Sequence, residues 1–320
     1  MEKRYFVNNI KIVANSAYFP QKEVKNNDLE KYLNLENGYI EKRTGIRNRY
    51  YAINEKIEDM ALKAVENMIK QSKQQDCINN VDLIIVATTS TNILMPGIAN
   101  YIQKMLEMTP CMCLDILAGC NGYINALDIA KTYIDSGRIN KALIIGVDKL
   151  SDVIDKEDVG TAIVLSDGAG ATLIEKDTNC HSPKKYISNI QSEGKNNEIL
   201  TYEYGKKLYM NGKEIYKYAV TETVDNIKEL LHNAKLTLED ITYIVPHQSN
   251  LKIMKAIASR LHIDMNKMYT NIQTRGNTFC ASIPIALYDM QNEQQLNKGD
   301  KIILLGYGGG LNTGSILLEI

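Results

Sequence analysis

Long apolar runs are missing from this sequence, and their absence excludes two classes of protein. No apolar segment approaches the roughly 20 consecutive residues that a membrane-spanning helix requires. Residues 6–17 are too polar to form the apolar core of a secretory signal. We therefore expect a soluble globular protein without a membrane segment or a secretory leader.

Cysteine and net charge are also scarce. Six cysteines among 320 residues are too few for a disulfide framework, so a reducing cytoplasm is the expected location. Cys111 and Cys113 have no further cysteine or histidine cluster at ligand spacing, so we interpret them as strand residues and predict no metal site. The formal net charge of -1 provides no general attraction to nucleic acid or to a membrane surface.

The most informative stretch is a strand that leads through a small-residue turn into an amphipathic helix. Residues 114–119 form the strand and turn, Cys120 begins the helix, and apolar positions recur at helical spacing up to Ile134, before Gly137. Backbone N–H groups and the positive end of the helix dipole then face the sulfur, so the thiol is expected to ionise more easily than a free thiol. Cys120 is a candidate nucleophile, although a lone cysteine is more often a buried structural residue.

The chain repeats one order of segments: helix, strand, polar loop and helix. The first copy comprises 60–72, 81–87, 88–92 and 97–107, and the second comprises 219–235, 241–245, 246–250 and 251–261. Strands that alternate with helices are typical of an α/β protein, and so long a period indicates a duplicated domain rather than a solenoid. We predict two units, residues 1–176 and 177–320.

Each copy then continues to the start of another helix. Residues 114–119 lead to Cys120 in the first copy and residues 269–276 lead to Asn277 in the second, which makes Cys120 and Asn277 predicted counterparts. If a pseudo-twofold axis relates the copies, both helix starts can converge on one pocket between them.

Three other segments have distinctive compositions. Both copies are predicted to close on a strand, a glycine-rich turn and a strand, at 164–175 and at 304–319. Between the copies, residues 177–208 are rich in Asn, Lys and Ser, and we expect a loop or excursion that borders the pocket mouth. Residues 43–49 form a basic turn, for which a solvated surface run of charge is an equally good interpretation.

Only one of the four histidines is placed for catalysis. His181 lies in the polar excursion, and His232 and His262 lie in or just after helices and are interpreted as structural. His247 follows the strand 241–245 through one proline, and a side chain just past a strand end can enter a cleft. We therefore take His247 as a second candidate catalytic residue.

Two glycine-containing segments have both a structural and a catalytic interpretation. Asn277 follows Gly276 and could be an ordinary turn residue, because Asn and Gly are common in turns. Residues 308–310 are three glycines between two strands, which could form a tight hairpin or present a backbone N–H group to an oxyanion.

Several segments together resemble the signatures of the β-ketoacyl-acyl-carrier-protein synthase III family. The main matches are AGCNGY at 118–123, VPHQSNLKI at 245–253, GNT at 276–278 and GGG at 308–310, and the supporting matches are KRTGIR at 42–47, SDGAGA at 166–171 and MNGKEIYK at 210–217. The matches keep the family's order and cover essentially the whole chain. The resemblance implies the thiolase fold, a duplicated five-layered αβαβα domain with pseudo-twofold-related halves.

The resemblance also implies the chemistry of a Cys-His-Asn site. Cys120 would attack the thioester of an acyl-coenzyme A primer, release coenzyme A and become acylated. Malonyl-acyl-carrier protein would then lose carbon dioxide while His247 and Asn277 hydrogen-bond its thioester oxygen. Attack of the carbanion on the acyl group would give 3-oxoacyl-acyl-carrier protein and initiate fatty acid synthesis. Backbone N–H groups of Cys120 and Gly309 would form the oxyanion hole, and no metal or cofactor is implied.

Asparagine at 277 distinguishes this family within the superfamily. The chain-elongating synthases have a second histidine at that place, and the degradative thiolases have a second cysteine in the final glycine loop. In this sequence Tyr307 precedes the glycines, so neither variant fits.

Further family positions imply the partners. The family commonly stacks a tryptophan on the coenzyme A adenine, but this chain has none, and Tyr39 takes that place. The resemblance also assigns Arg43 and Lys213 to coenzyme A binding. Met95 matches the position at which the second subunit of a homodimer reaches the floor of the acyl pocket. Carrier proteins are acidic, and three basic residues match the positions that meet them, namely Lys217, Lys252 and Arg260.

The choice of primer stays open because residues 194–208 look shorter than in typical members. The alternative is a synthase-III-like condensing enzyme or acyltransferase of a specialised pathway with an unusual acyl primer. A non-enzymatic carrier-binding paralogue is a third hypothesis, against which the presence of Cys120, His247 and Asn277 argues. A papain-like protease also uses Cys-His-Asn, but the duplicated α/β pattern argues against it.

Overall fold

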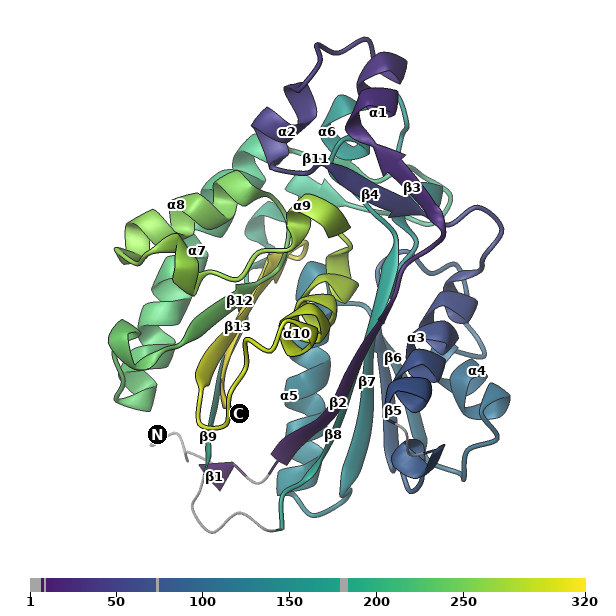
Figure 1. The fold of residues 1–320 in the computed structure, drawn as a ribbon, viewed down its shortest axis with the longest axis vertical. Coiled ribbons are helices and arrows are strands. Elements are labelled where there is room, and N and C mark those ends of the chain that lie inside the picture. Colours follow the sequence, from purple (N-terminus) through teal and green to yellow (C-terminus); the bar gives the residue numbers. More distant parts are fainter. Residues whose placement is uncertain (1–6, 9, 73–74, 179–183) are drawn as a thin grey trace.

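Two five-stranded sheets form the frame of the molecule (Figure 1). The computed structural model describes residues 7–8, 10–72, 75–178 and 184–320. In spatial order, the strands of the first sheet are β2 (Ile10–Tyr18), β8 (Gly168–Lys176), β7 (Lys141–Asp148), β5 (Leu83–Ala87) and β6 (Met112–Ile116). Those of the second sheet are β1 (Val7–Asn8), β9 (Lys184–Ser192), β14 (Asn312–Glu319), β13 (Lys301–Gly308) and β12 (Tyr243–Pro246).

The two sheets share one pattern of strand directions. In the first, β2, β8 and β7 are antiparallel in turn, and β5 and β6 continue parallel to β7. In the second, β9, β14 and β13 are antiparallel in turn, and β12 continues parallel to β13. A single parallel bridge from Ile244 to Met268 stands where β6 stands in the first sheet. The predicted duplication is therefore confirmed by topology.

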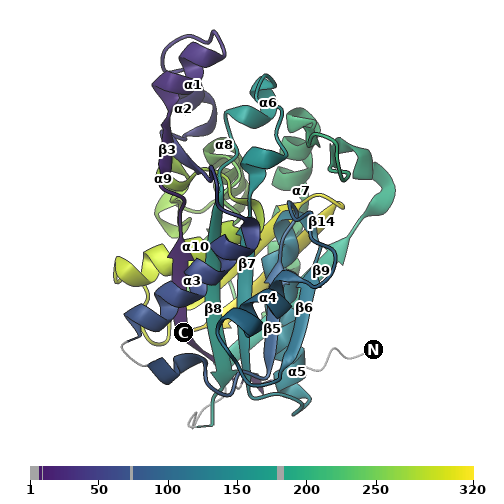
Figure 2. The ribbon, with the colours of Figure 1, turned by 90° about the vertical axis from the view of Figure 1, so that its right-hand side faces the viewer.

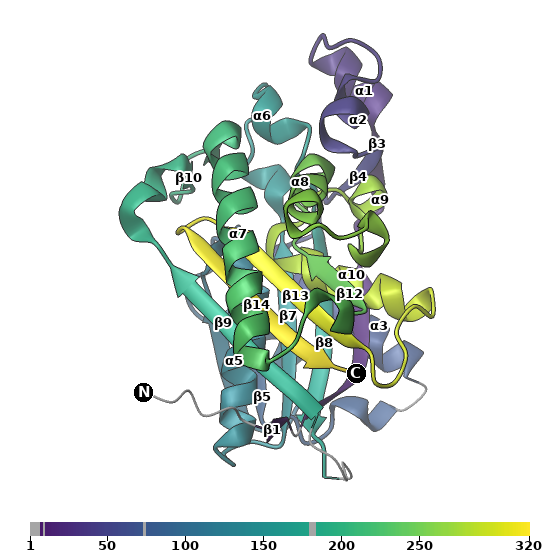
Figure 3. The ribbon, with the colours of Figure 1, turned by 90° about the vertical axis from the view of Figure 1, so that its left-hand side faces the viewer.

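The helices form three layers, one outside each sheet and one between the sheets. Helices α3 and α4 cover the first sheet (Figure 2), α5 and α10 lie in the centre, and α7 and α8 cover the second sheet (Figure 3). This order is the expected five-layered αβαβα arrangement. The bounds are α3 (Ile57–Gln71), α4 (Ile98–Met105), α5 (Gly122–Asp135), α10 (Ser282–Asn292), α7 (Gly212–Ala234) and α8 (Leu251–Leu261).

The layers follow from the apolar pattern of each element. Strand β5 is an uninterrupted apolar run with all its residues buried, as expected for a strand covered on both faces. Helix α3 buries residues at spacings of three and four, from Ile57 to Met68, against the first sheet. Helix α5 ends before Gly137, whose φ of 73° suits a glycine. Among the described residues, none of the helices combines the length and apolar character needed to cross a membrane.

Glycines bring the central helices unusually close to the sheets. Gly306 and Gly314 face each other across β13 and β14. A Cβ at Gly306 would lie 2.1 Å from the side chain of Asn121, and a Cβ at Gly314 would lie 2.9 Å from it. In the first sheet, a Cβ at Gly146 would lie 2.2 Å from the carbonyl oxygen of Cys280. The segments that lead into α5 and α10 are therefore packed directly on sheet backbone.

Shorter elements gather around the ends of the sheets. Two small antiparallel sheets pair β3 with β4 and β10 with β11. The first of them lies with α1 and α2 at the top of Figure 1. Their bounds are β3 (Lys22–Lys25), β4 (Asn48–Tyr51), β10 (Leu200–Thr201), β11 (Tyr209–Met210), α1 (Asn26–Tyr32), α2 (Tyr39–Thr44), α6 (Val159–Ala162) and α9 (Ile272–Arg275). The 3₁₀ helices are η1 (Gln75–Ile78), η2 (Gly119–Asn121), η3 (Leu150–Asp152), η4 (Gly194–Ile199), η5 (Leu238–Asp240), η6 (Met265–Lys267) and η7 (Phe279–Ala281).

The predicted closing unit at 164–175 is wrong. Its glycines lie inside the continuous strand β8, because α10 packs on them: a Cβ at Gly170 would lie 2.9 Å from the backbone nitrogen of Ile285. The counterpart of the hairpin β13–β14 is the antiparallel pair β7–β8, whose strands are separated by residues 149–167. The prediction for 304–319 is confirmed.

Two further segments differ from expectation. Residues 177–208 are not all excursion, because Lys184–Ser192 forms strand β9 of the second sheet, which is paired with β14 and, at one end, with β1. Residues 269–276, the counterpart of the strand and turn at 114–119, contain only the short helix α9. The division into units at residue 176 remains a prediction.

Candidate active site

The candidate nucleophile lies in the 3₁₀ helix η2, between β6 and α5. Gly119 has φ of 56°, and a Cβ there would lie 2.9 Å from the carbonyl oxygen of Gly309. The glycine therefore allows the turn to lie against the loop that follows β13. Cys120 itself is buried, with 3% of its surface exposed.

The electrostatics of the thiol differ from the sequence prediction. The backbone N–H groups of Cys120 and Gly309 act to lower its pKa, but burial, assisted by the charge of Asp148, raises the pKa of Cys120 well above its ordinary value. The expectation of an easily ionised thiol is therefore wrong. The resting form is a neutral thiol, and its proton must leave as the sulfur attacks.

His247 lies just past the end of β12, as predicted. Its backbone N–H donates to the carbonyl of Leu305 at 2.7 Å, and its ring Nδ1 lies 2.7 Å from Oγ of Ser282. Burial lowers the pKa of His247 to about 3, so the imidazole is neutral. Because the hydroxyl occupies Nδ1, the other ring nitrogen is the one left for a ligand.

Strand β13 ends against both the cysteine and the histidine. The ring of Tyr307 meets the ring of His247 edge-on, with 5.4 Å between centroids, and its hydroxyl lies 2.7 Å from Oγ of Ser249. The next residue, Gly308, leaves no room for a side chain, because a Cβ there would lie 2.8 Å from Cβ of Cys120. One strand end therefore connects the two candidate residues.

Asn277 lies between α9 and η7 and is buried. Its backbone forms a parallel bridge with Leu165, and its side-chain oxygen accepts the N–H of Phe279 at 3.0 Å. With the oxygen engaged, the amide nitrogen is left as the donor. Phe279 in turn lines the cavity beside Cys120.

The predicted pairing of Cys120 with Asn277 is wrong by three residues. The 3₁₀ helix η7 before α10 corresponds to η2 before α5, so the counterpart of Cys120 is Cys280. Cys280 is buried, and its Sγ donates to the carbonyl of Gly119 at 3.0 Å. The sequence signal was available, because both turns carry a cysteine at the same place relative to the helix.

A cavity of about 670 Å³, a size typical of small-molecule sites, opens beside Cys120. Its lining is mainly apolar and includes Leu117, Leu200, Leu208 and Phe279. Residues 200–208 thus border the cavity, as predicted for the excursion. His247 and Asn277 do not line it. In the described residues, no group of three or more His, Cys, Asp or Glu side chains is arranged to hold a metal ion.

Met95 does not line the cavity of its own chain. Its side chain is 90% exposed, whereas the neighbouring Leu94 lines the cavity although it is 88% exposed. The assignment of Met95 to an acyl pocket therefore needs a second subunit and stays a prediction.

The residues predicted for coenzyme A lie at the surface. The Arg43 guanidinium lies over the ring of Tyr39, 4.9 Å from its centroid, on α2. Lys213 is exposed in the first turn of α7. The basic turn 43–49 is only partly a surface run, because Arg49 is fully buried and donates to the side chain of Asn26.

The three residues predicted for the carrier protein share one side of the molecule. Lys217 is exposed on α7, and Lys252 and Arg260 are exposed on α8. Arg260 donates to Oγ of Thr221, one turn after Lys217, at 3.3 Å. α7 packs on α8, and we refer to the three exposed cations on this helix pair as the basic face.

The other histidines do not enter the candidate site. His232 is exposed in the last turn of α7, and His262 is exposed at the C-terminal end of α8 with φ of 56°. The interpretation of both as structural stays a prediction. His181 lies outside the described residues.

Two regions of the chain match models of one protein family. Residues 114–194 match the family model of 3-oxoacyl-acyl-carrier-protein (ACP) synthase III, and residues 231–320 match the model of its C-terminal part. The chain is 36% identical to the β-ketoacyl-acyl-carrier-protein synthase III of Clostridium novyi, over 97% of this chain and 99% of that protein.

Solved structures agree with this match. The crystal structure of 3-oxoacyl-acyl-carrier-protein synthase III from Aquifex aeolicus is 35% identical, with a TM-score of 0.92, 97% of this chain covered and 100% of that one. A priming β-ketosynthase of a polyketide biosynthetic pathway is 26% identical, with a TM-score of 0.89, 99% of this chain covered and 98% of that one.

Proposed function

Because the chain belongs to the β-ketoacyl-acyl-carrier-protein synthase III family, we propose that it condenses an acyl-coenzyme A primer with malonyl-acyl-carrier protein. The products are 3-oxoacyl-acyl-carrier protein, coenzyme A and carbon dioxide, and the reaction initiates fatty acid synthesis. The observation that carries the proposal is the environment of Cys120, which has two backbone N–H groups at its sulfur and a cavity beside it.

In the first half-reaction, the Cys120 sulfur attacks the primer thioester and coenzyme A leaves as a thiol. The thiol proton passes to the leaving sulfur by way of a base, and the neutral imidazole of His247 is the candidate for that base. The N–H groups of Cys120 and Gly309 stabilise the oxyanion, and one such donor is typically worth about 3–4 kcal/mol of barrier.

In the second half-reaction, negative charge develops on the malonyl thioester oxygen as carbon dioxide leaves. His247 and Asn277 donate to that oxygen, and the carbanion attacks the acyl group on Cys120. The Ser282 hydroxyl can donate to Nδ1 of His247 or accept from it, so the outer ring nitrogen can serve as donor here and as acceptor in the first half-reaction.

Partners and location follow from the same proposal. Coenzyme A would be held by Tyr39, Arg43 and Lys213, and the acidic carrier protein would dock on the basic face formed by Lys217, Lys252 and Arg260. The protein would act as a cytoplasmic homodimer and need no metal or cofactor beyond its thioester substrates. The edge strand β6 and the exposed side chains of Leu94, Met95 and Leu117 support a dimer, because exposed apolar patches mark interfaces.

A second candidate is a condensing enzyme or acyltransferase of a specialised pathway with an unusual primer. The similarity to a priming β-ketosynthase of a polyketide pathway favours it. The cavity wall at Leu200, Tyr202, Tyr204 and Leu208 comes from the short excursion, which is where a change of primer would be accommodated.

One experiment separates these functions. The protein is incubated with a panel of acyl-coenzyme A compounds and weighed intact, and each acylated sample is then given malonyl-acyl-carrier protein. Acylation at Cys120 followed by release of 3-oxoacyl-acyl-carrier protein supports the main proposal, and the preferred acyl group decides between the two candidates. Absence of any adduct on the wild-type chain would reject both and favour a carrier-binding protein without activity.

A further inference from the structure

The short helix α9 joins the histidine loop to the asparagine. Its N-terminal end is capped by Gln248, the residue after His247, whose side-chain oxygen accepts the N–H groups of Asn271 at 3.0 Å and Ile272 at 3.3 Å. The side-chain nitrogen of Gln248 donates to the carbonyl of Pro246 at 2.8 Å. The start of α9 is thereby fixed to the loop that carries the imidazole.

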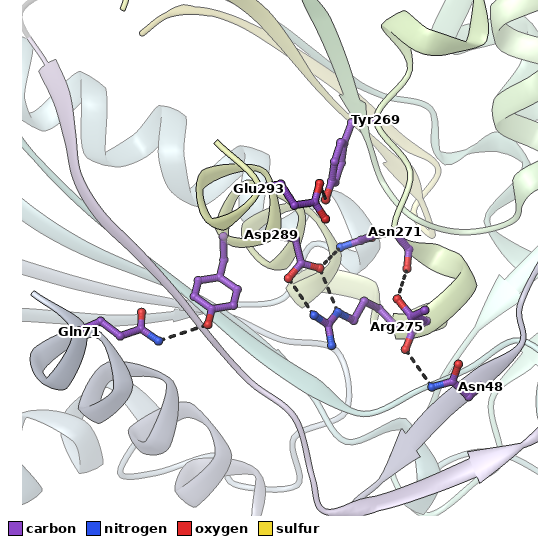
Figure 4. Close-up of polar contacts among 9 residues, drawn as sticks. Asn48, Gln71, Tyr269, Asn271, Arg275, Asp289 and Glu293 are labelled. Carbon is purple, nitrogen blue, oxygen red and sulfur yellow. Dashed lines mark hydrogen bonds and ion pairs between the residues drawn. The ribbon is translucent and has the colours of Figure 1, made fainter. Parts of the chain in front are cut away.

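The C-terminal end of α9 is fixed to the central helix α10 (Figure 4). Nε and Nη2 of Arg275 donate to the two carboxylate oxygens of Asp289, each at 2.9 Å, and the side chain of Asn271 donates to the same carboxylate at 2.9 Å. The guanidinium also lies over the ring of Phe19, 4.1 Å from its centroid. The Asp289 side chain is only 8% exposed, so this fork is well shielded from water.

Helix α10 therefore supports both residues that donate to the thioester oxygen in the second half-reaction, His247 and Asn277. Ser282 and Asp289 are seven residues apart and lie on the same face of α10. Ser282 contacts the imidazole of His247 directly, and Asp289 holds α9, which ends two residues before Asn277.

The link from Arg275 to Asn277 leaves little freedom. It is the single residue Gly276, which has φ of 68°, and a Cβ there would lie 2.7 Å from Cβ of Ser166. A shift of α9 is consequently passed to Asn277 rather than absorbed by the linker.

We propose that Asp289 and Arg275 are positioning residues for condensation, acting through α9 to set Asn277 at the same distance from the substrate as His247. The inference rests on the proposed function. Donors to a developing enolate must lie within a few tenths of an ångström of their productive places, and a misplacement of about 1 Å can cost about 100-fold in rate. Acylation of Cys120 does not use Asn277, so it should not depend on this pair.

The test compares two aspartates on the two central helices. Asp289→Asn removes the charge that holds Arg275, and the control Asp135→Asn removes the charge that pairs with the buried Lys131 at the end of α5. Each variant is first acylated with the preferred acyl-coenzyme A, and the acylation rate is followed by intact mass. The acylated protein is then mixed with malonyl-acyl-carrier protein in a single turnover.

Asp289→Asn should slow the single-turnover condensation by about 10- to 100-fold and acylation by less than about 3-fold, whereas Asp135→Asn should change neither rate by more than that. Arg275→Lys keeps the charge but not the fork and should give an intermediate loss in condensation alone. It also carries the test if Asp289→Asn does not fold.

Three outcomes would overturn the inference. Equal losses in acylation and condensation would indicate general loosening of the fold, and unchanged condensation in Arg275→Lys and Asp289→Asn would show that Asn277 does not depend on the pair. A wild-type protein that acylates but never condenses would reject the proposed function itself and, with it, this inference, and that result is visible before any variant is made.

Discussion

Cys120 and Cys280 occupy the same place in the two copies and differ in what faces the sulfur. Cys120 has two backbone N–H groups at its sulfur and a cavity beside it, whereas Cys280 donates its thiol proton to the carbonyl of Gly119. Strand β7 ends in Asp148, whose carboxylate accepts the N–H of Cys280 at 3.0 Å, and the equivalent strand β13 ends in Gly308. Two backbone N–H groups and a cavity thus accompany only the sulfur of Cys120, which makes the turn of the first copy the candidate nucleophile site.

The histidine shows the same contrast with the copies exchanged. His247 and Ser282 in the second copy correspond to Ala87 and Gly122 in the first, where a Cβ on the glycine would lie only 3.1 Å from the alanine Cβ. His247 and Ser282 form a hydrogen bond, whereas Ala87 and Gly122 only pack against each other. Each copy therefore carries one of the two candidate catalytic residues, and the equivalent place in the other copy lacks the same hydrogen-bonding groups.

The largest expected effect is the difference between the two cysteines when each is replaced separately by alanine. Cys120→Ala should lower condensation by more than about 1,000-fold, because no other group can form the acyl-enzyme. Cys280→Ala should keep most of the activity of the wild type. The measurement is the steady-state rate with the preferred primer, and comparable losses in both variants would break the comparison.

Removal of the histidine or the amide should separate the two half-reactions. His247→Ala or Asn277→Ala is expected to slow condensation by about 100- to 1,000-fold, the size typical of a lost oxyanion donor. Acylation of Cys120 should persist in part, as shown by intact mass. Normal condensation by either variant would remove that residue from the enolate role.

The glycine at the end of β13 provides a sharper test of space around the sulfur. Gly308→Ala places a methyl group 2.8 Å from Cβ of Cys120 and should lower the acylation rate by about 10- to 100-fold. Gly212→Ala is the control, because nothing lies within 4 Å of a Cβ there. If Gly308→Ala acylates as fast as the control, the close approach is not required for attack.

The buried imidazole should appear in the pH dependence of stability. Burial lowers the pKa of His247 to about 3, so at pH values between about 3 and 6.5 the unfolded chain binds a proton that the folded chain does not. This contribution to stability is complete above pH 6.5 and is lost as the pH falls toward 3, by about 2 kcal/mol between pH 7 and pH 5. In urea unfolding, His247→Gln should show a correspondingly smaller loss over that interval, and an identical loss would contradict the burial.

The smallest expected effect concerns the outer helices α8 and α4, which are also counterparts. Lys252→Ala on α8 should raise the KM for malonyl-acyl-carrier protein by about 2- to 5-fold at low salt, and the difference should fade as ionic strength rises. Lys104→Ala on α4 is the matched control and should leave KM unchanged. A salt-independent change, or an equal change in the control, would argue against docking on the basic face.

Sequence patterns predicted the elements that local chemistry determines. The strand at β5, the helix at 251–261 and the turn at Cys120 follow from apolar periodicity, small residues and helix starts, and all three are present. The position of His247 at a strand end was likewise readable, because a strand followed by a proline and a polar loop leaves little alternative.

Tertiary packing determined the features that the sequence patterns did not predict. The glycines of β8 were expected in a turn, but they lie in a strand because α10 needs that space. The thiol of Cys120 was expected to ionise easily, but burial depends on the cavity walls from distant segments. Asp148 and Asp289 carry no local pattern that would reveal them, since their partners lie on other elements: Thr89 and Cys280 for Asp148, and Arg275 for Asp289.

The close contact of the central helices with the sheets has a consequence for how such an enzyme can change. Gly146, Gly306 and Gly314 leave little room between the sheets and the segments that lead into α5 and α10, so the turn that carries Cys120 is closely packed. The walls at 200–208 belong to a peripheral connection that bears none of that constraint. Selection for a new acyl chain can therefore act on this wall while the bond-forming apparatus stays the same.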